Sequence, residues 1–208
     1  MKDNQIVNEK RQLALDKMAD NDYEIYALLK QRYSPRIFDD KELDENDVKR
    51  LFEAVRWAAS ASNIQPWRFI YAHKGTEAYD KIFGCLAEFN QGWADNAPFL
   101  MLTAYYEKKD NGEENFHALH DLGLCLGNMS VQAQYMGIAL HHMAGVDWKK
   151  AHEVFEVPDG YHVTTCVAAG YYGGDIDNLS EDLQKQETAK RKRMPQEEFA
   201  FKEEWKTK

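Results

Sequence analysis

The run Arg32-Tyr33-Ser34-Pro35-Arg36 contains the residue types that bind phosphate. Guanidinium groups stay charged at any working pH and hold phosphate through paired hydrogen bonds, so arginines and a hydroxyl on one turn suit a phosphorylated ligand. Pro35 prevents a helix that ends near Lys30 from simply continuing. Taken alone, the run is explained more simply as a surface cluster of ion pairs.

A second basic run, Lys190-Arg191-Lys192-Arg193, lies near the carboxyl terminus. An isolated run of this kind is typical of a solvated patch or a nucleic-acid-binding tail. Between the two runs, the segment from Ala59 to Phe69 passes through small polar residues into an expected strand. Small residues allow close approach of a flat ligand, and the amides of Asn63 and Gln65 can both donate and accept hydrogen bonds.

The overall charge argues against nucleic acid and membrane as partners. The chain of 208 residues has 26 Lys and Arg against 35 Asp and Glu, a net charge of −9, so any bound anion needs a local basic cluster. No apolar run is long enough to span a bilayer, and the start of the chain is polar where a signal peptide would be apolar. We therefore expect a soluble, cytoplasmic protein.

We expect neither a disulfide nor a metal site. The cysteines lie far apart in apolar stretches, which favours small buried residues; they are Cys85, Cys125 and Cys166. His117, His120 and Asp121 lack a further ligand at a recognisable spacing, so we expect no metal there. His141 and His142 should point to opposite faces of a strand, so that at most one of them reaches any one site.

Helices and strands must position these residues. Apolar residues at helical spacing predict an amphipathic helix from Asp44 to Ala59, with Asp44 as its N-cap. Apolar residues on nearly all faces predict a buried helix from Phe116 to Met136. Runs rich in β-branched and aromatic residues predict strands at Phe69–Ala72, Phe99–Ala104, Ile138–Met143 and Val163–Ala169. This order indicates an α/β or α+β fold with a central sheet.

The chain shows no internal repeat and no linker. Residues 21–208 are therefore expected to form a single domain behind a peripheral amino-terminal segment, residues 1–20. The charged segment 181–208 is also expected to be peripheral. Neither a Gly-x-Gly-x-x-Gly motif nor a Walker loop is present, which disfavours a Rossmann domain and an NTPase.

Four motifs in one order and spacing carry a family resemblance. They are Arg32-Tyr33-Ser34-Pro35-Arg36; Arg56-Trp57-Ala58-Ala59-Ser60 leading to Asn63-Ile64-Gln65-Pro66-Trp67-Arg68-Phe69; Asn90-Gln91-Gly92-Trp93-Ala94; and Arg193-Met194-Pro195-Gln196-Glu197-Glu198. From about Tyr23 to Phe199, the chain resembles the nitroreductase family of FMN-dependent oxidoreductases. Similar sequences often carry Pro where this chain has Ala59, which puts the contact at that position in doubt.

The resemblance implies an α+β fold, with a central, mostly antiparallel sheet flanked by helices, in an intertwined homodimer with FMN at the subunit interface. The helix from Phe116 to Met136 corresponds to the family's interface helix, although an ordinary core helix stays an alternative. The implied phosphate ligands belong to the first motif and the late basic run; they are Arg32, Ser34, Arg36, Arg191 and Arg193, with Tyr33 on the same turn. The implied flavin-ring contacts are Ala59, Ser60, Ala61 and Asn63 from the partner subunit, and Asn90, Ala144 and Gly145.

The implied activity is a ping-pong reaction. NADH or NADPH delivers hydride to bound FMN, and a nitroaromatic, quinone or similar electron-poor small molecule then takes the electrons in the same pocket. The cofactor carries this chemistry, so no side chain is assigned as catalytic. A flavin- or phosphoanion-binding carrier or sensor without turnover needs the same phosphate contacts, and the motifs do not separate the two.

Aromatic residues follow the late basic run at Phe199, Phe201 and Trp205. Burial of each one stabilises the folded protein by about 1.5–3 kcal/mol, so this tail should pack on something. The resemblance implies that the segment from Glu197 to Phe201 packs across the partner subunit. Packing on its own subunit is the alternative.

Overall fold

A four-stranded antiparallel sheet with the order β1-β2-β4-β3 forms the centre of the computed structural model, which describes residues 16–205. The strands are β1 (Trp67–His73), β2 (Phe99–Tyr106), β3 (Ile138–Met143) and β4 (Tyr161–Tyr171). All the predicted strands are confirmed, and so is the α+β class. The last strand extends two residues further at each end than predicted, because β2 pairs with it as far as Tyr161 and β3 pairs with it as far as Tyr171.

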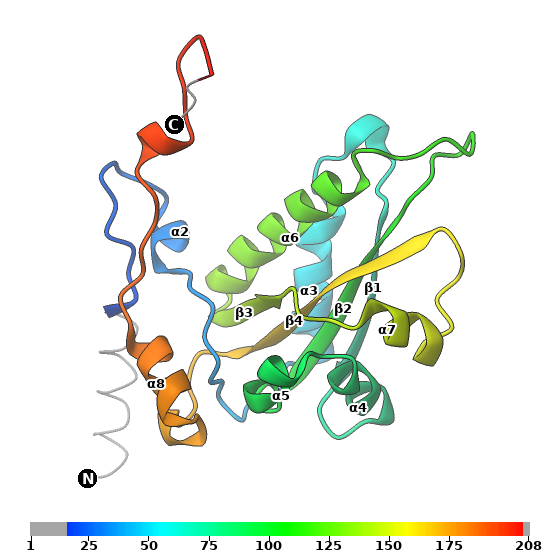
Figure 1. Cartoon of the computed structure of the whole chain (residues 1–208). Coiled ribbons are helices and arrows are strands. Elements are labelled where there is room, and N and C mark those ends of the chain that lie inside the picture. The colour runs from blue at the N-terminus through cyan, green and yellow to red at the C-terminus, as the bar shows by residue number, and fades with distance from the viewer. Residues whose placement is uncertain (1–15, 206–208) are drawn as a thin grey trace.

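Helices cover both faces of the sheet (Figure 1). One face carries α3 (Glu45–Arg56) and α6 (Ala118–Tyr135). The other carries α4 (Glu77–Gly84), α5 (Glu88–Ala94) and α7 (Trp148–Val154). Two short helices, α2 (Ala27–Gln31) and α8 (Glu181–Thr188), lie beyond the β3 edge together with the terminal segments. The 3₁₀ turns are η1 (Ala61–Asn63), η2 (Ile176–Asn178) and η3 (Gln196–Glu198).

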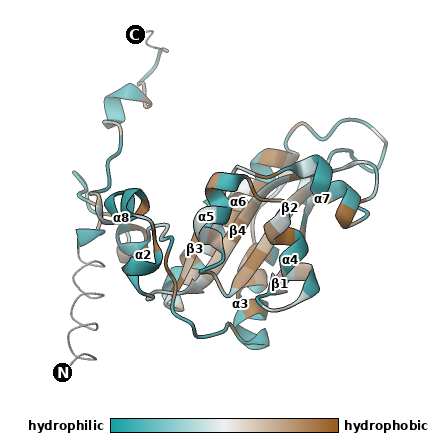
Figure 2. Ribbon diagram, turned by 60° about the horizontal axis from the view of Figure 1, so that its bottom comes forward, coloured by the Kyte–Doolittle hydropathy of each residue, from teal (hydrophilic) through white to brown (hydrophobic). Residues whose placement is uncertain are grey.

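Side chains alternate across β2 and β4 and form two buried clusters, one on each face of the sheet. Leu100 and Cys166 belong to the cluster beneath α4, α5 and α7. Met101 and Val167 belong to the cluster beneath α3 and α6. Figure 2 shows hydrophobic residues concentrated on the strands and on the helix sides that face them, whereas α2, α8 and the tail are mainly hydrophilic.

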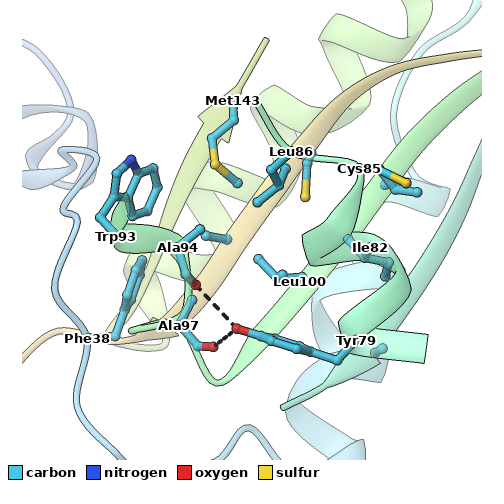
Figure 3. Close-up of a cluster of buried hydrophobic side chains, with 14 of the residues drawn as sticks. Phe38, Tyr79, Ile82, Cys85, Leu86, Trp93, Ala94, Ala97, Leu100 and Met143 are labelled. Carbon is cyan, nitrogen blue, oxygen red and sulfur yellow. Dashed lines mark hydrogen bonds between the residues drawn. The ribbon is translucent and has the colours of Figure 1, made fainter. Parts of the chain in front are cut away.

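Trp93 and Tyr79 lie at the outer side of the first cluster (Figure 3). Trp93 is fully buried, and the Tyr79 hydroxyl donates to the carbonyl of Ala97 at 2.7 Å, so the buried phenol keeps a hydrogen-bond partner. Burial raises the pKa of Tyr79, and the nearby Asp95 carboxylate adds to the effect. The packing of Trp93 holds α5 against the sheet and so sets the position of Asn90, one turn earlier on the same helix.

The two longer helices follow the predicted pattern in part. Asp44 caps α3 by accepting a hydrogen bond from the backbone N–H of Asp47 at 2.7 Å, as predicted, and the helix ends three residues before Ala59. One side of α6 is buried, but Leu119 and Leu124 on the other side are 57% and 41% exposed. The expected burial on all sides is therefore wrong for the single chain, because only one side of α6 meets the sheet and α3.

The terminal segments are less peripheral than expected. Lys17 is buried, and its Nζ donates to the carbonyl of Ala189 at 2.6 Å. Leu183 and Glu187 of α8 are buried as well, so the chain is peripheral only beyond α8. The expectation for residues 1–15 lies outside the described residues, and the domain boundary at residue 20 stays a prediction.

Three further expectations concern cysteine, metal and membrane. The cysteines are all buried and free, as predicted. Within residues 16–205, no group of three His, Cys, Asp or Glu side chains is arranged to hold a metal ion. Among the same residues, no helix is both long and apolar enough to cross a membrane.

Candidate functional site

Residues 32–36, here named the arginine turn, pass along the edge strand β3. His141 of β3 donates through Nδ1 to the carbonyl of Pro35 at 2.9 Å. On the other side, the backbone N–H of Arg36 donates to Oε2 of Glu187 in α8 at 3.1 Å. Phe38 then forms a bridge with Tyr172, just after β4. The turn is therefore held between the sheet edge and α8.

Four of the predicted phosphate ligands lie together at the start of the arginine turn. Arg32 donates through Nη1 to the hydroxyl of Ser34 at 3.4 Å. Arg191 donates through Nη1 to the carbonyl of Lys30 at 3.1 Å, which ties the late basic run to the end of α2. Burial and the nearby charges of Arg32 and Arg193 lower the pKa of Arg191. We name these residues, Arg32, Ser34, Arg191 and Arg193, the basic cluster.

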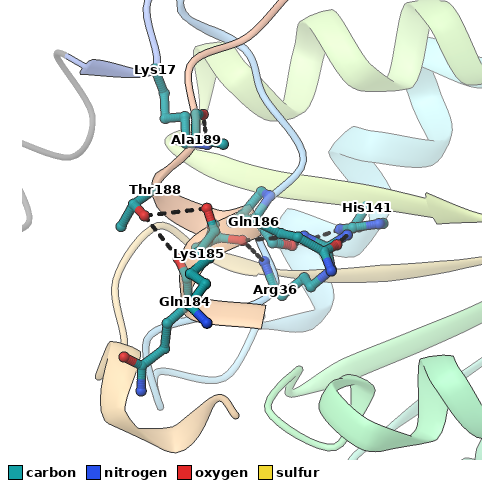
Figure 4. A network of polar contacts seen from close by, with 10 residues as sticks. Lys17, Arg36, His141, Gln184, Lys185, Gln186, Thr188 and Ala189 are labelled. Atoms are coloured by element: carbon teal, nitrogen blue, oxygen red, sulfur yellow. Dashed lines mark hydrogen bonds and ion pairs between the residues drawn. The ribbon is translucent and has the colours of Figure 1, made fainter. Parts of the chain in front are cut away.

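The Arg36 side chain faces a carboxylate instead (Figure 4). Its Nη1 lies 3.8 Å from Oε2 of Glu187, and its Nη2 donates to Oε1 of Gln186 at 3.1 Å. Glu187 is only 2% exposed, and burial raises its pKa even though Arg36 and Lys17 favour its ionised form. The structure thus places Arg36 in an ion pair with α8.

The Tyr33 side chain is held by an aromatic contact. Its ring packs on that of Tyr172, with centroids 5.2 Å apart, and burial raises the pKa of its hydroxyl. Beside the turn, Nε of Arg36 and Oε1 of Glu187 are buried without a hydrogen-bond partner among the described residues. Unpaired buried polar atoms are costly, so these atoms mark a place where a ligand or water would complete the site.

Asn90 and Gly145, which are 55 positions apart in sequence, meet between α5 and the end of β3. The Asn90 Nδ2 donates to the carbonyl of Gly145 at 3.2 Å, and the backbone N–H of Ala87 donates to the same carbonyl at 2.9 Å. A Cβ atom on residue 145 would lie 2.8 Å from Asn90 Nδ2. The loop at Ala144 therefore passes so close to α5 that only glycine fits at position 145.

The segment from Ala59 to Asn63 lies elsewhere. Ser62 and Asn63 have positive φ angles, 50° and 57°, and the backbone N–H of Ala61 donates to Oδ2 of Asp121 at 3.1 Å. The Ser60 hydroxyl accepts from the backbone N–H of residue 65 at 3.1 Å. Asp121 is in the first turn of α6 and is 1% exposed, so a buried carboxylate holds this segment in place.

Opposite ends of α6 separate this segment from the arginine turn. Asp121 contacts Ala61, whereas Gln134, near the other end of α6, accepts a hydrogen bond from the Tyr172 hydroxyl at 2.7 Å. Thirteen residues of helix span about 20 Å. Within one chain, the structure brings the four residues of the basic cluster together. It also brings Asn90 into contact with Gly145. The Ala59–Asn63 segment lies near neither of these groups.

The sequence reasoning missed two buried carboxylates, Glu187 and Asp121. Glu187 follows Leu183 at the i+4 position of α8, so it shares the buried side of that helix. That spacing was a usable signal within an otherwise charged segment. Asp121 was considered only as a metal ligand, and no sequence feature points to its contact with a backbone N–H 60 positions earlier.

Comparison with known proteins gives consistent matches. The model of the nitroreductase family matches residues 29–88 and 78–171. A solved structure described as an oxidoreductase containing FMN is 32% identical, with a TM-score of 0.84, over 91% of this chain and 96% of that one. An uncharacterised 15.4 kDa protein of Mycolicibacterium smegmatis is 29% identical over 66% of this chain and 97% of its own length. A Ralstonia nicotianae protein, provisionally named an NADH dehydrogenase/NAD(P)H nitroreductase, is 24% identical over 58% of this chain and 71% of its own length.

Proposed function

The chain belongs to the nitroreductase family, and from this membership we propose that it is an FMN-dependent oxidoreductase. In this proposal NADH or NADPH is the electron donor, and a nitroaromatic, quinone or similar electron-poor molecule is the acceptor in the same pocket. The basic cluster, formed in a chain with net charge −9, is the observation that carries the proposal. The FMN-containing relative and the name of the Ralstonia nicotianae relative support the cofactor and the donor.

The residues present fit FMN. Arg32, Arg191, Arg193 and the hydroxyl of Ser34 offer charge-assisted donors for a phosphate. When bound, FMN would accept a hydride and pass electrons to the second substrate. The Arg36 guanidinium, held by Glu187, would direct its unpaired Nε toward the cofactor instead of gripping the phosphate.

The protein would position the flavin ring mainly through backbone. Asn90 fixes the loop at Ala144 and Gly145, and the absence of a Cβ at Gly145 leaves that loop packed tightly on α5. In the proposal this loop lies against the reactive edge of the ring. No side chain of the described site is required as a nucleophile or as a general acid.

The decisive experiment is anaerobic reduction of the purified protein. The protein should be isolated yellow, and addition of NADH or NADPH should bleach the flavin absorbance within the dead time of manual mixing. Addition of an acceptor such as a quinone should then restore the yellow colour. A protein that binds flavin but is bleached by neither nucleotide is a carrier or sensor, and one that binds no flavin contradicts the proposal.

We further propose that the active unit is a homodimer with flavin shared across the interface. The segment Ala59–Asn63 lies about 20 Å along α6 from the arginine turn, so one chain cannot present both to one ligand. A second copy could, and the exposed side of α6, with Leu119, Leu124 and two glycines, offers a close-packing surface. The tail after α8 extends away from the sheet (Figure 1), and its aromatic residues Phe199 and Trp205 are exposed, as packing on a partner requires.

Light scattering tests this dimer. A mass near that of one 24.2 kDa chain with full flavin content would contradict it. Truncation after Pro195 removes the tail aromatics but leaves the basic cluster, and should lower both dimer stability and FMN retention. A truncated protein that stays dimeric and yellow at micromolar concentration would show that the tail has no role at the interface.

A further inference from the structure

His142 faces the side of β3 that carries α6, opposite His141. Its Nε2 lies 3.1 Å from the hydroxyl of Ser130 in α6. That hydroxyl has a single hydrogen, which it donates to the carbonyl of Leu126 at 2.8 Å. The imidazole must therefore donate through Nε2, which leaves Nδ1 as the basic nitrogen. The hydrogen bonds of the described residues leave this Nδ1 without a partner.

The surroundings of this imidazole are positive. Burial lowers the pKa of His142 to about 4, and the guanidinium of Arg32 contributes in the same direction. Beyond Arg32 lie Arg191 of the late basic run and the Tyr172 hydroxyl after β4. The other titratable neighbour on the strand, His141, is on the opposite face and bonds to Pro35. A neutral imidazole with a free nitrogen thus borders the basic cluster.

We propose that His142 is a further anion-binding residue of the cofactor site, which takes up a proton when the FMN phosphate binds beside Arg32. The protonated ring donates through Nδ1 to the phosphate, while Nε2 keeps its bond to Ser130. The inference rests on the proposed function, because it needs FMN as the ligand. It adds a residue to which the sequence analysis gave no role, beyond the expectation that at most one of His141 and His142 reaches any one site.

The direction of the coupling follows from electrostatics. Without ligand, burial and Arg32 disfavour a second positive charge on the imidazole. A phosphate dianion offsets most of the positive charge of the basic cluster, and an anion in contact with the ring favours its protonated form, which is then a charge-assisted donor. Since the bound state holds the additional proton, FMN affinity must fall as the pH rises through the pKa that His142 has in the complex.

Isothermal titration of the flavin-free protein tests the proposal. FMN is added at pH 7.5 in two buffers of different ionisation enthalpy, and the difference in heat gives the number of protons exchanged. At this pH the phosphate, with a second pKa of about 6, is almost fully ionised and contributes little. We expect a net uptake of protons on FMN binding. Riboflavin, which has no phosphate, should give none.

His142→Gln keeps a donor for Ser130 and cannot take up a proton, so its FMN binding should show no uptake at pH 7.5 and no fall in affinity as the pH rises from there. His162→Gln on β4, whose ring packs on Tyr105 and Trp148 away from the basic cluster, is the control and should keep the uptake. Equal uptake with FMN and riboflavin, or undiminished uptake in His142→Gln, would overturn the assignment.

If the variant does not fold, the comparison of the two flavins on the native chain decides. A protein that binds neither flavin contradicts the proposed function itself, whereas FMN binding without proton uptake contradicts only this inference.

Discussion

The sheet interior and the β3 edge are held by different kinds of contact. In the interior, Leu100 and Ile82 are fully buried in apolar surroundings. At the edge, the buried groups include the charged side chains of Lys17 and Glu187, paired with backbone and with Arg36. Apolar packing is complete without a ligand, whereas the edge retains unpaired polar atoms and a cluster of like charges. We therefore expect the ligand to bind at the edge and most of the free energy of unfolding to come from the interior.

The largest loss of stability should come from the interior. Leu100→Ala removes a fully buried side chain near the start of β2, where the strand is paired on both sides, and should lower the free energy of unfolding by about 4 kcal/mol. Urea unfolding followed by circular dichroism measures it. Leu29→Ala on α2, where the side chain is 45% exposed, is the matched control and should change little. Equal effects of the two substitutions would remove the distinction between interior and edge.

A smaller loss should follow from breaking the charge network at the edge. Glu187→Ala leaves Arg36 and Lys17 without their buried counter-charge, which should cost about 3 kcal/mol of stability. The same denaturation experiment measures it. Glu53→Ala, which breaks an exposed ion pair with Arg56, is the control and should have a much smaller effect. A Glu187 variant as stable as the native chain would mean that the edge is held by packing alone.

Replacement of basic-cluster arginines should affect binding more than stability. Arg32→Ala or Arg193→Ala should each weaken FMN binding about ten- to a hundredfold, because each charge-assisted contact with phosphate is worth about 1.5–3 kcal/mol. Flavin fluorescence titration gives the dissociation constants, and thermal unfolding should be nearly unchanged. Arg50→Ala on α3 is the control. Unchanged flavin occupancy in the double variant at low FMN concentration would remove these residues from the site.

The same contrast decides what the sequence could predict. The strands follow from runs rich in β-branched and aromatic residues and α3 follows from apolar periodicity, and the structure confirms them. The edge could not be predicted in this way, because its contacts join charged residues far apart in sequence. Arg36 and Glu187 are 151 positions apart, and Lys17 and Ala189 are 172 apart. No local sequence pattern predicts contacts between residues so far apart.

The basic cluster was predicted by resemblance, and the structure brings its members together without showing a ligand. Of the residues assigned to phosphate, Arg36 is the one that the structure pairs with a carboxylate. His142 was passed over because two adjacent histidines cannot serve one face of a strand. In fact each imidazole meets the arginine turn from its own face, His141 at Pro35 and His142 near Arg32.

The smallest effect expected is a pH dependence that belongs to the edge alone. Burial raises the pKa of Glu187, so the native state binds more protons than the unfolded state between the usual pKa, about 4.3, and the higher native value. The contribution of this group to stability is therefore complete at acid pH and declines as the pH rises through the native pKa. Glu53, with its pKa lowered to about 2 by hydrogen bonds from Arg56 and Trp57, has the opposite sign.

The difference between the native chain and Glu187→Gln isolates this effect, because the contributions of Glu53 and all other carboxylates cancel. Gln resembles the protonated acid and does not titrate. From pH 4 towards neutrality, the unfolding free energy of the native chain should therefore fall relative to that of the variant, as measured by urea unfolding at each pH. Leu100→Ala, tested in parallel, should keep a constant difference from the native chain, since no titrating group is changed. A native-minus-variant difference for Glu187→Gln that stays flat or grows with pH would mean that the ion pair with Arg36 outweighs burial.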